Sequence, residues 1–174
     1  LVAASDGVFA REIRLHQTVG LNVIAINGKN RSTSARRYGS SGNPNDLRNW
    51  DIHKSAIDLN ESAQKMLDAE YVEAGQMPVV LANKVGGVIF HEACGHLLET
   101  TQIERGTTPC AEKLDKQIAN EALTAIDEGS TSGAFGSISI DDEGMEPTRK
   151  VLIEKGILKG FLSDRAGELR TGHK

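Results

Sequence analysis

One apolar stretch, residues 85–98, constrains the fold more than any other part of this sequence. It is apolar on almost every side of a helix, so we expect a helix over residues 87–99 that is buried in the protein. Three ionisable residues, His91, Glu92 and His96, interrupt it without a local partner. Burying them unpaired would cost about 1–3 kcal/mol for each unsatisfied group. A metal ion removes much of that cost, because two imidazoles can bind it and the carboxylate can bind its water.

The spacing of the two histidines predicts an irregular helix. The familiar zinc helix is His-Glu-x-x-His, with ligands four residues apart on one face. His96 follows His91 by five residues, and on a regular helix the two side chains would diverge by roughly 140°. A π-helical turn between them would bring both to one side. Gly95, directly before His96, gives the backbone room for that turn.

Other interpretations of these residues remain open. The two histidines could be core residues with satisfied hydrogen bonds, because one short motif carries little information. Cys94 is either a competing ligand or a small core residue, which is the more common environment of a free cysteine. Cys110 is expected at a helix start, where a thiolate is favoured, but no histidine is tied to it as a catalytic partner. Residues 141–143, Asp-Asp-Glu, lack the spacing of a calcium loop and favour an acidic turn.

The rest of the chain predicts an α+β fold in which antiparallel β-sheets pack around the buried His-Glu-x-x-x-His helix and two further helices. Asn27-Gly28 follows an apolar run and predicts a type I′ hairpin turn. Gly75 should end the first helix. Short strands are expected at residues 77–82, 135–140, 150–154 and 157–163, and the last two should be joined by a turn at Lys155-Gly156. The predicted elements are a β-hairpin region over 1–45, a helix over 51–74, the motif helix over 87–99, a helix over 109–128 and a β region over 135–165.

Composition excludes several classes of protein. A chain of 174 residues suits one domain, and its net charge of −4 argues against a nucleic-acid-binding surface. Two cysteines give no disulfide framework and favour a reducing compartment, the cytoplasm. No run approaches the roughly 18 apolar residues needed to cross a membrane. The chain begins at Leu1, without an initiator Met or a signal sequence, so we expect a central fragment of a longer protein.

Five blocks of the sequence together resemble the TldD/PmbA family. Their order and spacing match the family along nearly the whole chain, which makes them far more specific than one hexapeptide. The blocks are residues 2–7, 77–81, 87–96, 136–144 and 151–160.

The resemblance implies an intracellular zinc metallopeptidase that degrades or matures peptides and unfolded proteins. Members of this family are also labelled modulators of DNA gyrase. His91 and His96 would bind zinc, and Glu92 would assist the attack of a metal-bound water on the peptide bond. The family's third ligand is a cysteine far downstream, to which neither Cys94 nor Cys110 corresponds. The third protein ligand is therefore expected outside this chain.

The family typically pairs an active subunit that bears the motif with an inactive homologue that lacks it. The resemblance therefore implies a dimer, formed with a second copy or with such a homologue. The alternative is a non-catalytic interaction subunit whose motif is structural or vestigial.

With only two ligands, the 174-residue chain by itself should bind zinc loosely or not at all, unless Glu99, Cys110 or an acid from residues 141–143 completes the site.

Overall fold

The computed structural model describes residues 1–173 and divides them into two compact units, where the sequence predicted one domain. The first unit contains residues 3–76 and 130–139, together with Leu1. The second contains residues 77–129 and the chain from 140 onward, together with Val2. The mixture of helices and antiparallel sheets confirms the predicted α+β class. No helix of the described residues has the length and hydropathy needed to cross a membrane.

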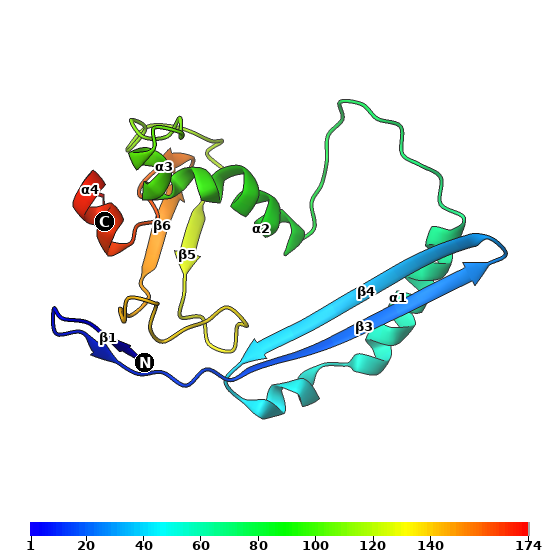
Figure 1. Ribbon diagram of the computed structural model, residues 1–174. Helices are drawn as coiled ribbons and strands as arrows, with labels where there is room; N and C mark the ends of the chain where they lie inside the picture. The colour runs from blue at the N-terminus through cyan, green and yellow to red at the C-terminus, as the bar shows by residue number, and fades with distance from the viewer. Residues whose placement is uncertain (174) are drawn as a thin grey trace. The chain divides into compact units, whose positions relative to one another are not determined.

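A long β-hairpin dominates the first unit (Figure 1). Strand β3 (His16–Asn27) pairs antiparallel with β4 (Asn30–Ser41), and the register runs without a break from His16↔Ser41 to Asn27↔Asn30. Exposure alternates along β3, as expected for a strand with one covered face. The predicted hairpin is confirmed, but its turn type is not. Of the two loop residues, Gly28 and Lys29, only Gly28 has positive φ, whereas a type I′ turn requires positive φ at both.

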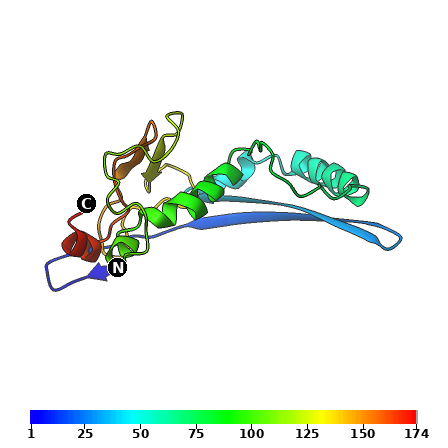
Figure 2. The same ribbon diagram turned by 90° about the horizontal axis from the view of Figure 1, so that it is seen from above.

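Helix α1 (Ile52–Leu67) lies along this hairpin (Figure 2) and packs against both of its strands. The Asp51 side chain caps the helix by accepting the Lys54 N–H at 2.8 Å. The helix ends at Leu67, well before the predicted stop at Gly75, although the intervening residues include good helix formers. Residues beyond Leu67 have no apolar surface to cover, as the full exposure of Tyr71 shows, and packing supplies most helical stability in proteins. Strand β1 (Val2–Ala3) pairs with β2 (Phe9–Ala10), and the first unit also contains the 3₁₀ helix η1 (Pro44–Asn49).

Glu12 links two distant segments of the first unit. Its carboxylate accepts the Ser139 N–H at 2.6 Å and forms an ion pair with Arg14. The Ser139 hydrogen bond, aided by Arg14, lowers the pKa of Glu12 from 4.5 to about 2. Because the pKa is lower in the folded state, this contribution to stability is complete above pH 4.5 and is lost as the pH falls towards 2.

Glu12→Gln is therefore expected to flatten the acid dependence of unfolding between pH 4.5 and 2, as measured by denaturant titrations at several pH values. Glu61→Gln, an exposed change on α1, is the control, and equal pH slopes in both variants would contradict the assignment.

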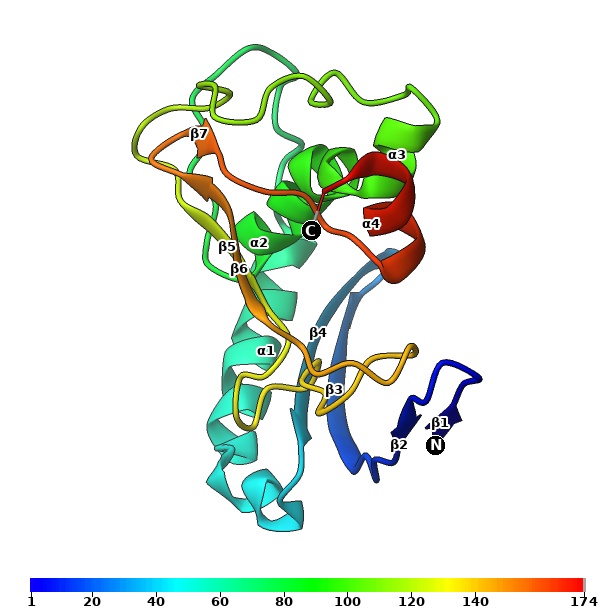
Figure 3. The same ribbon diagram turned by 90° about the vertical axis from the view of Figure 1, so that its left-hand side faces the viewer.

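The second unit contains a three-stranded antiparallel sheet (Figure 3). Its strand order is β5 (Ala125–Glu128), β6 (Arg149–Glu154), β7 (Ile157–Leu158). The predicted turn at Lys155-Gly156 is confirmed, and both residues have positive φ, 47° and 80°, as a type I′ turn requires. The sheet contributes to a core whose fully buried members share an apolar character: Leu98, Ala125, Leu152, Ile153, Leu158 and Phe161.

The predicted helix over residues 109–128 is wrong. Residues 109–124 form turns and irregular chain, and residues 125–128 form β5. Tertiary pairing overrides the helical pattern, because the N–H groups of Ile118 and Ala119 both donate to the Gly156 carbonyl at 2.9 and 3.1 Å. Asp115 also has a φ of 59°, which a right-handed helix does not allow.

Two predicted strands are absent from the described residues, and a third is short. Residues 77–82 form no strand and are exposed, with Val80 98% exposed. Residues 135–140 form a turn, irregular chain and a bend rather than a strand, and the strand predicted over 157–163 ends at Leu158. Two short helices were not predicted, α3 (Thr100–Glu104) and α4 (Arg165–Thr171), and they pack against each other.

Candidate metal centre

The motif helix is continuous but changes its winding at the motif. It begins as α2 (Val85–Phe90), widens into the π-helical turn η2 (His91–Gly95) and tightens into the 3₁₀ turn η3 (His96–Leu98). The His96 N–H donates to the His91 carbonyl, five residues back, which is the bond that defines a π turn. The irregular helix predicted from the spacing is therefore confirmed. The role predicted for Gly95 is not, because its φ of −54° and ψ of −54° are ordinary for any residue.

The π turn brings the two histidines together. Their ring centroids lie 4.5 Å apart, with the ring planes at 66°. One ligand atom from each of His91, Glu92 and His96 can be chosen so that all three lie within 4.8 Å of one another. Two imidazoles and a carboxylate match the donor types that zinc prefers. In a tetrahedral site, two ligand atoms at 2.1 Å from the ion are about 3.4 Å apart, so the side chains need to close by a small distance.

Glu99 contacts this cluster in a way that the sequence did not reveal. The Nδ1 atom of His96 lies 2.7 Å from the Glu99 Oε1 atom. On the other side of the same ring, Nε2 lies 3.9 Å from the Glu92 Oε2 atom. From the sequence alone, Glu99 was expected only as a possible third ligand. Its spacing of three residues from His96, which places two side chains on one side of a helix, was the available signal.

The expected burial of the motif helix is wrong for the described residues. Val88 and Ile89 are 59% and 45% exposed, and the Glu92 and His96 side chains are 68% and 49% exposed. Only Gly95 and Leu98 of the helix are fully buried. Water can therefore solvate the ionisable groups here, and the cost of burying them is no argument for a metal. The convergence of the side chains is the argument that remains.

The other residues considered as ligands do not join the cluster. Among residues 1–173, the only group of side chains that could hold a metal ion is His91, Glu92 and His96. Cys94 is half-buried and free, and Cys110 is also free and packs against the apolar core. Cys110 does not begin a helix, because none forms there. The Asp141 carboxylate accepts the backbone N–H groups of Glu143 and Met145 at 2.8 and 2.9 Å, which confirms an acidic turn.

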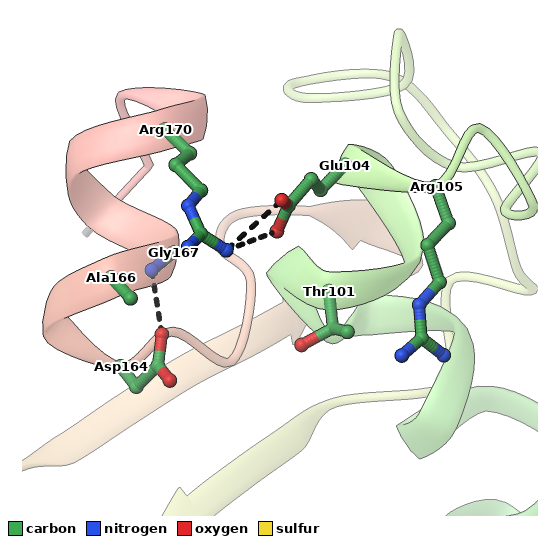
Figure 4. Close-up of a pocket in the computed structure, with 7 residues that line it drawn as sticks. All are labelled: Thr101, Glu104, Arg105, Asp164, Ala166, Gly167 and Arg170. Carbon is green, nitrogen blue, oxygen red and sulfur yellow. Dashed lines mark hydrogen bonds and ion pairs between the residues drawn. The ribbon is translucent and has the colours of Figure 1, made fainter.

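A separate pocket lies between α3 and α4 (Figure 4). Arg170 donates to both carboxylate oxygens of Glu104, at 3.0 and 3.1 Å, and Asp164 accepts the Gly167 N–H at 2.6 Å. The two helices approach closely at Gly167, where a Cβ atom would lie 2.1 Å from Thr100 Oγ1. Since the carboxylates lining this pocket already have partners in the protein, it is a packing feature of the second unit and not part of the metal centre.

Comparison with known proteins places these features in a family. A family profile described as the PmbA/TldA metallopeptidase C-terminal domain matches residues 74–174. A metalloprotease TldD homologue of Buchnera aphidicola subsp. Acyrthosiphon pisum is 32% identical over 181 residues, covering 100% of this chain and 38% of that protein. A metalloprotease of Methanocaldococcus jannaschii is 33% identical over 145 residues, covering 83% of this chain and 32% of that protein. The chain thus spans well under half the length of these curated relatives.

Solved structures show the same fold. A crystal structure described as a modulator of DNA gyrase from Thermotoga maritima superposes with a TM-score of 0.73 at 20% identity, over 90% of this chain and 35% of that one. TldE from Thermococcus kodakarensis superposes with a TM-score of 0.60 at 20% identity, over 91% of this chain and 35% of that one. The resemblance found in the five sequence blocks is confirmed, and the profile match, which covers more than half of the chain, shows that this chain belongs to the PmbA/TldD family of metallopeptidases.

Proposed function

We propose that this chain supplies the metal-binding helix of a zinc-dependent peptidase. The observation that carries the proposal is the π turn, which gathers His91, Glu92 and His96 so that their ligand atoms lie within 4.8 Å of one another. His91 and His96 would hold the ion through their imidazole nitrogens. Glu92 is adjacent to His91 in sequence and 3.9 Å from His96 Nε2, and it would exchange protons at the same point.

The chemistry divides between the ion and the protein. A zinc ion at this position would supply a Lewis acid that polarises the scissile carbonyl and acidifies water. Glu92 would accept the proton of the attacking water and return it to the leaving amine, so that one carboxylate serves both halves of amide hydrolysis. Because the Glu92 side chain is well exposed in the described residues, a substrate can reach it.

The wider assignments rest on the relatives and on composition. Relatives named metalloproteases support peptides or unfolded proteins as the substrate class. TldE, which shares the fold, supports a companion subunit as partner, and a dimer with a second copy is the other arrangement. Two free cysteines suit a reducing compartment such as the cytoplasm. A catalytic zinc site normally has three protein ligands, so the third would come from the part of the protein beyond this chain.

The rival function is a non-catalytic interaction subunit that retains the motif without binding metal. It is favoured by one observation, namely that the possible metal-binding group within residues 1–173 holds no side chain besides the two imidazoles and Glu92. Metal content separates the two functions directly.

The test is the zinc content of the full-length protein, purified from metal-replete cells. We expect close to one zinc per chain in the wild type and almost none in His91→Ala, because removing one imidazole leaves too few ligands. His53→Ala, which alters an exposed histidine on α1, is the matched control and should keep its zinc. A wild-type protein free of zinc would support the interaction subunit instead.

A further inference from the structure

Beyond the three motif residues, the side chain of Glu99 contacts the imidazole ring of His96. His96 can carry its proton on either ring nitrogen when it is neutral, and only the nitrogen without the proton can bind a metal. The contact between Nδ1 and Glu99 Oε1, at 2.7 Å, is well within hydrogen-bonding distance. A carboxylate accepts hydrogen bonds and donates none, so the proton in this contact belongs to Nδ1.

The opposite nitrogen of the ring is left with its lone pair. Nε2 is the atom that faces Glu92, at 3.9 Å, and the ring of His91 is 4.5 Å away from that of His96. The hydrogen bond to Glu99 therefore selects the tautomer whose unprotonated nitrogen faces Glu92.

Glu99 is held both by the end of the motif helix, where its N–H donates to the His96 carbonyl at 3.5 Å, and by pairing with the core of the second unit. Its φ of −76° and ψ of 135° are extended, so it lies just after the helix ends. The residues on either side of it pair with Leu162, since the Thr100 N–H donates to the Leu162 carbonyl at 2.8 Å and the Leu162 N–H donates to the Leu98 carbonyl at 2.7 Å. Leu98 and Thr100 are both buried, at 1% and 2% exposure. The carboxylate therefore extends from a backbone that is fixed on both sides.

From this geometry we infer that Glu99 is a positioning residue, which fixes the tautomer and the ring orientation of His96 so that Nε2 is offered to the metal. The inference rests on the proposed function, because it assigns a second carboxylate to the same site. It places Glu99 outside the set of ligands, in contrast to the third-ligand role considered from sequence. Carboxylates that hold a metal-binding histidine in this way contribute about 10–100-fold to metal affinity.

The first measurement uses the metal-free full-length protein and needs no activity. In the wild type, ¹⁵N NMR of His96 should show a protonated Nδ1 and an unprotonated Nε2. In Glu99→Ala the two tautomers should mix, whereas Glu99→Gln should preserve the wild-type signature because its amide oxygen can still accept from Nδ1. An unchanged tautomer in Glu99→Ala would overturn the inference.

The second measurement is a zinc titration of the same proteins. We expect Glu99→Ala to weaken zinc binding by about 10–100-fold and Glu99→Gln to recover most of the loss. Glu104→Ala is the matched control. Glu104 follows Glu99 by five residues, but it pairs with Arg170 and not with a histidine. An affinity equal to that of wild type in Glu99→Ala would overturn the inference and leave the proposed function standing. If the tautomer changes in Glu99→Ala but the wild-type protein takes up no zinc, Glu99 remains the residue that orients His96. The proposed function would then be removed.

Discussion

Replacing Glu92 with glutamine is expected to lower peptide cleavage by the full-length protein by about 10²–10⁴-fold, the range associated with general acid–base catalysis. Glutamine has nearly the volume of glutamate but cannot accept a proton from water. The zinc content should stay near that of the wild type, because His91 and His96 are unchanged and hold the ion in the proposed site. Paired measurements of turnover and of metal content by mass spectrometry check both halves of this expectation.

The matched control for this variant is Glu112→Gln, which makes the same chemical change at an exposed position outside the cluster. It should retain full turnover. If Glu92→Gln turned over substrate at the wild-type rate, Glu92 would have no part in the chemistry. If it lost its zinc as well as its activity, Glu92 would be a ligand and not the proton acceptor.

Gly156→Ala is expected to destabilise the second unit by about 3 kcal/mol or more, through a backbone clash and an unfavourable φ acting together. Gly156 has a φ of 80°, and a Cβ atom there would lie 2.3 Å from the Ala119 carbonyl oxygen and 2.1 Å from the Gln117 side-chain amide. Its own carbonyl accepts two N–H groups and its N–H donates to the Leu123 carbonyl at 2.8 Å, so the segment cannot move away without losing hydrogen bonds. Chemical denaturation followed by circular dichroism measures the loss.

Gly106→Ala separates the two causes. Gly106 also has a positive φ, 66°, but a Cβ atom there would meet nothing within 4 Å. Its cost should therefore be limited to conformational strain, about 1 kcal/mol. Equal losses in the two variants would mean that the close approach at Gly156 relaxes at little cost.

Local signals predicted those parts of the structure that depend on neighbouring residues. The β3–β4 hairpin and the Lys155-Gly156 turn form within a few residues of the patterns that predicted them. The π turn was also predictable, because a five-residue spacing has few other ways to bring two side chains to one side of a helix. The π turn positions His91, Glu92 and His96, so most of the candidate site followed from the sequence.

The errors occur where distant segments decide the structure. The spacing over residues 109–128 is helical, but pairing with the turn at Gly156 and with Leu158 holds part of that segment in irregular chain. The apolar motif helix was expected to be buried, yet burial depends on what covers it, and the described residues leave Val88 and Ile89 exposed. Glu99 acquires its backbone position from a β-bridge to Leu162, more than sixty residues away, which the sequence near Glu99 does not indicate.

The π turn has a consequence for how insertions and deletions in such helices are read. It is the form a helix takes when one residue is added and the turns on both sides keep their places. Phe90, before the turn, and Leu98, after it, both pack on the apolar core. The difference between a four-residue and a five-residue histidine spacing is thus absorbed within a single turn. Two proteins whose histidines are four and five residues apart can therefore bring the same pair of imidazoles together. A sequence motif that fixes the number of residues between the histidines will match only one of the two proteins.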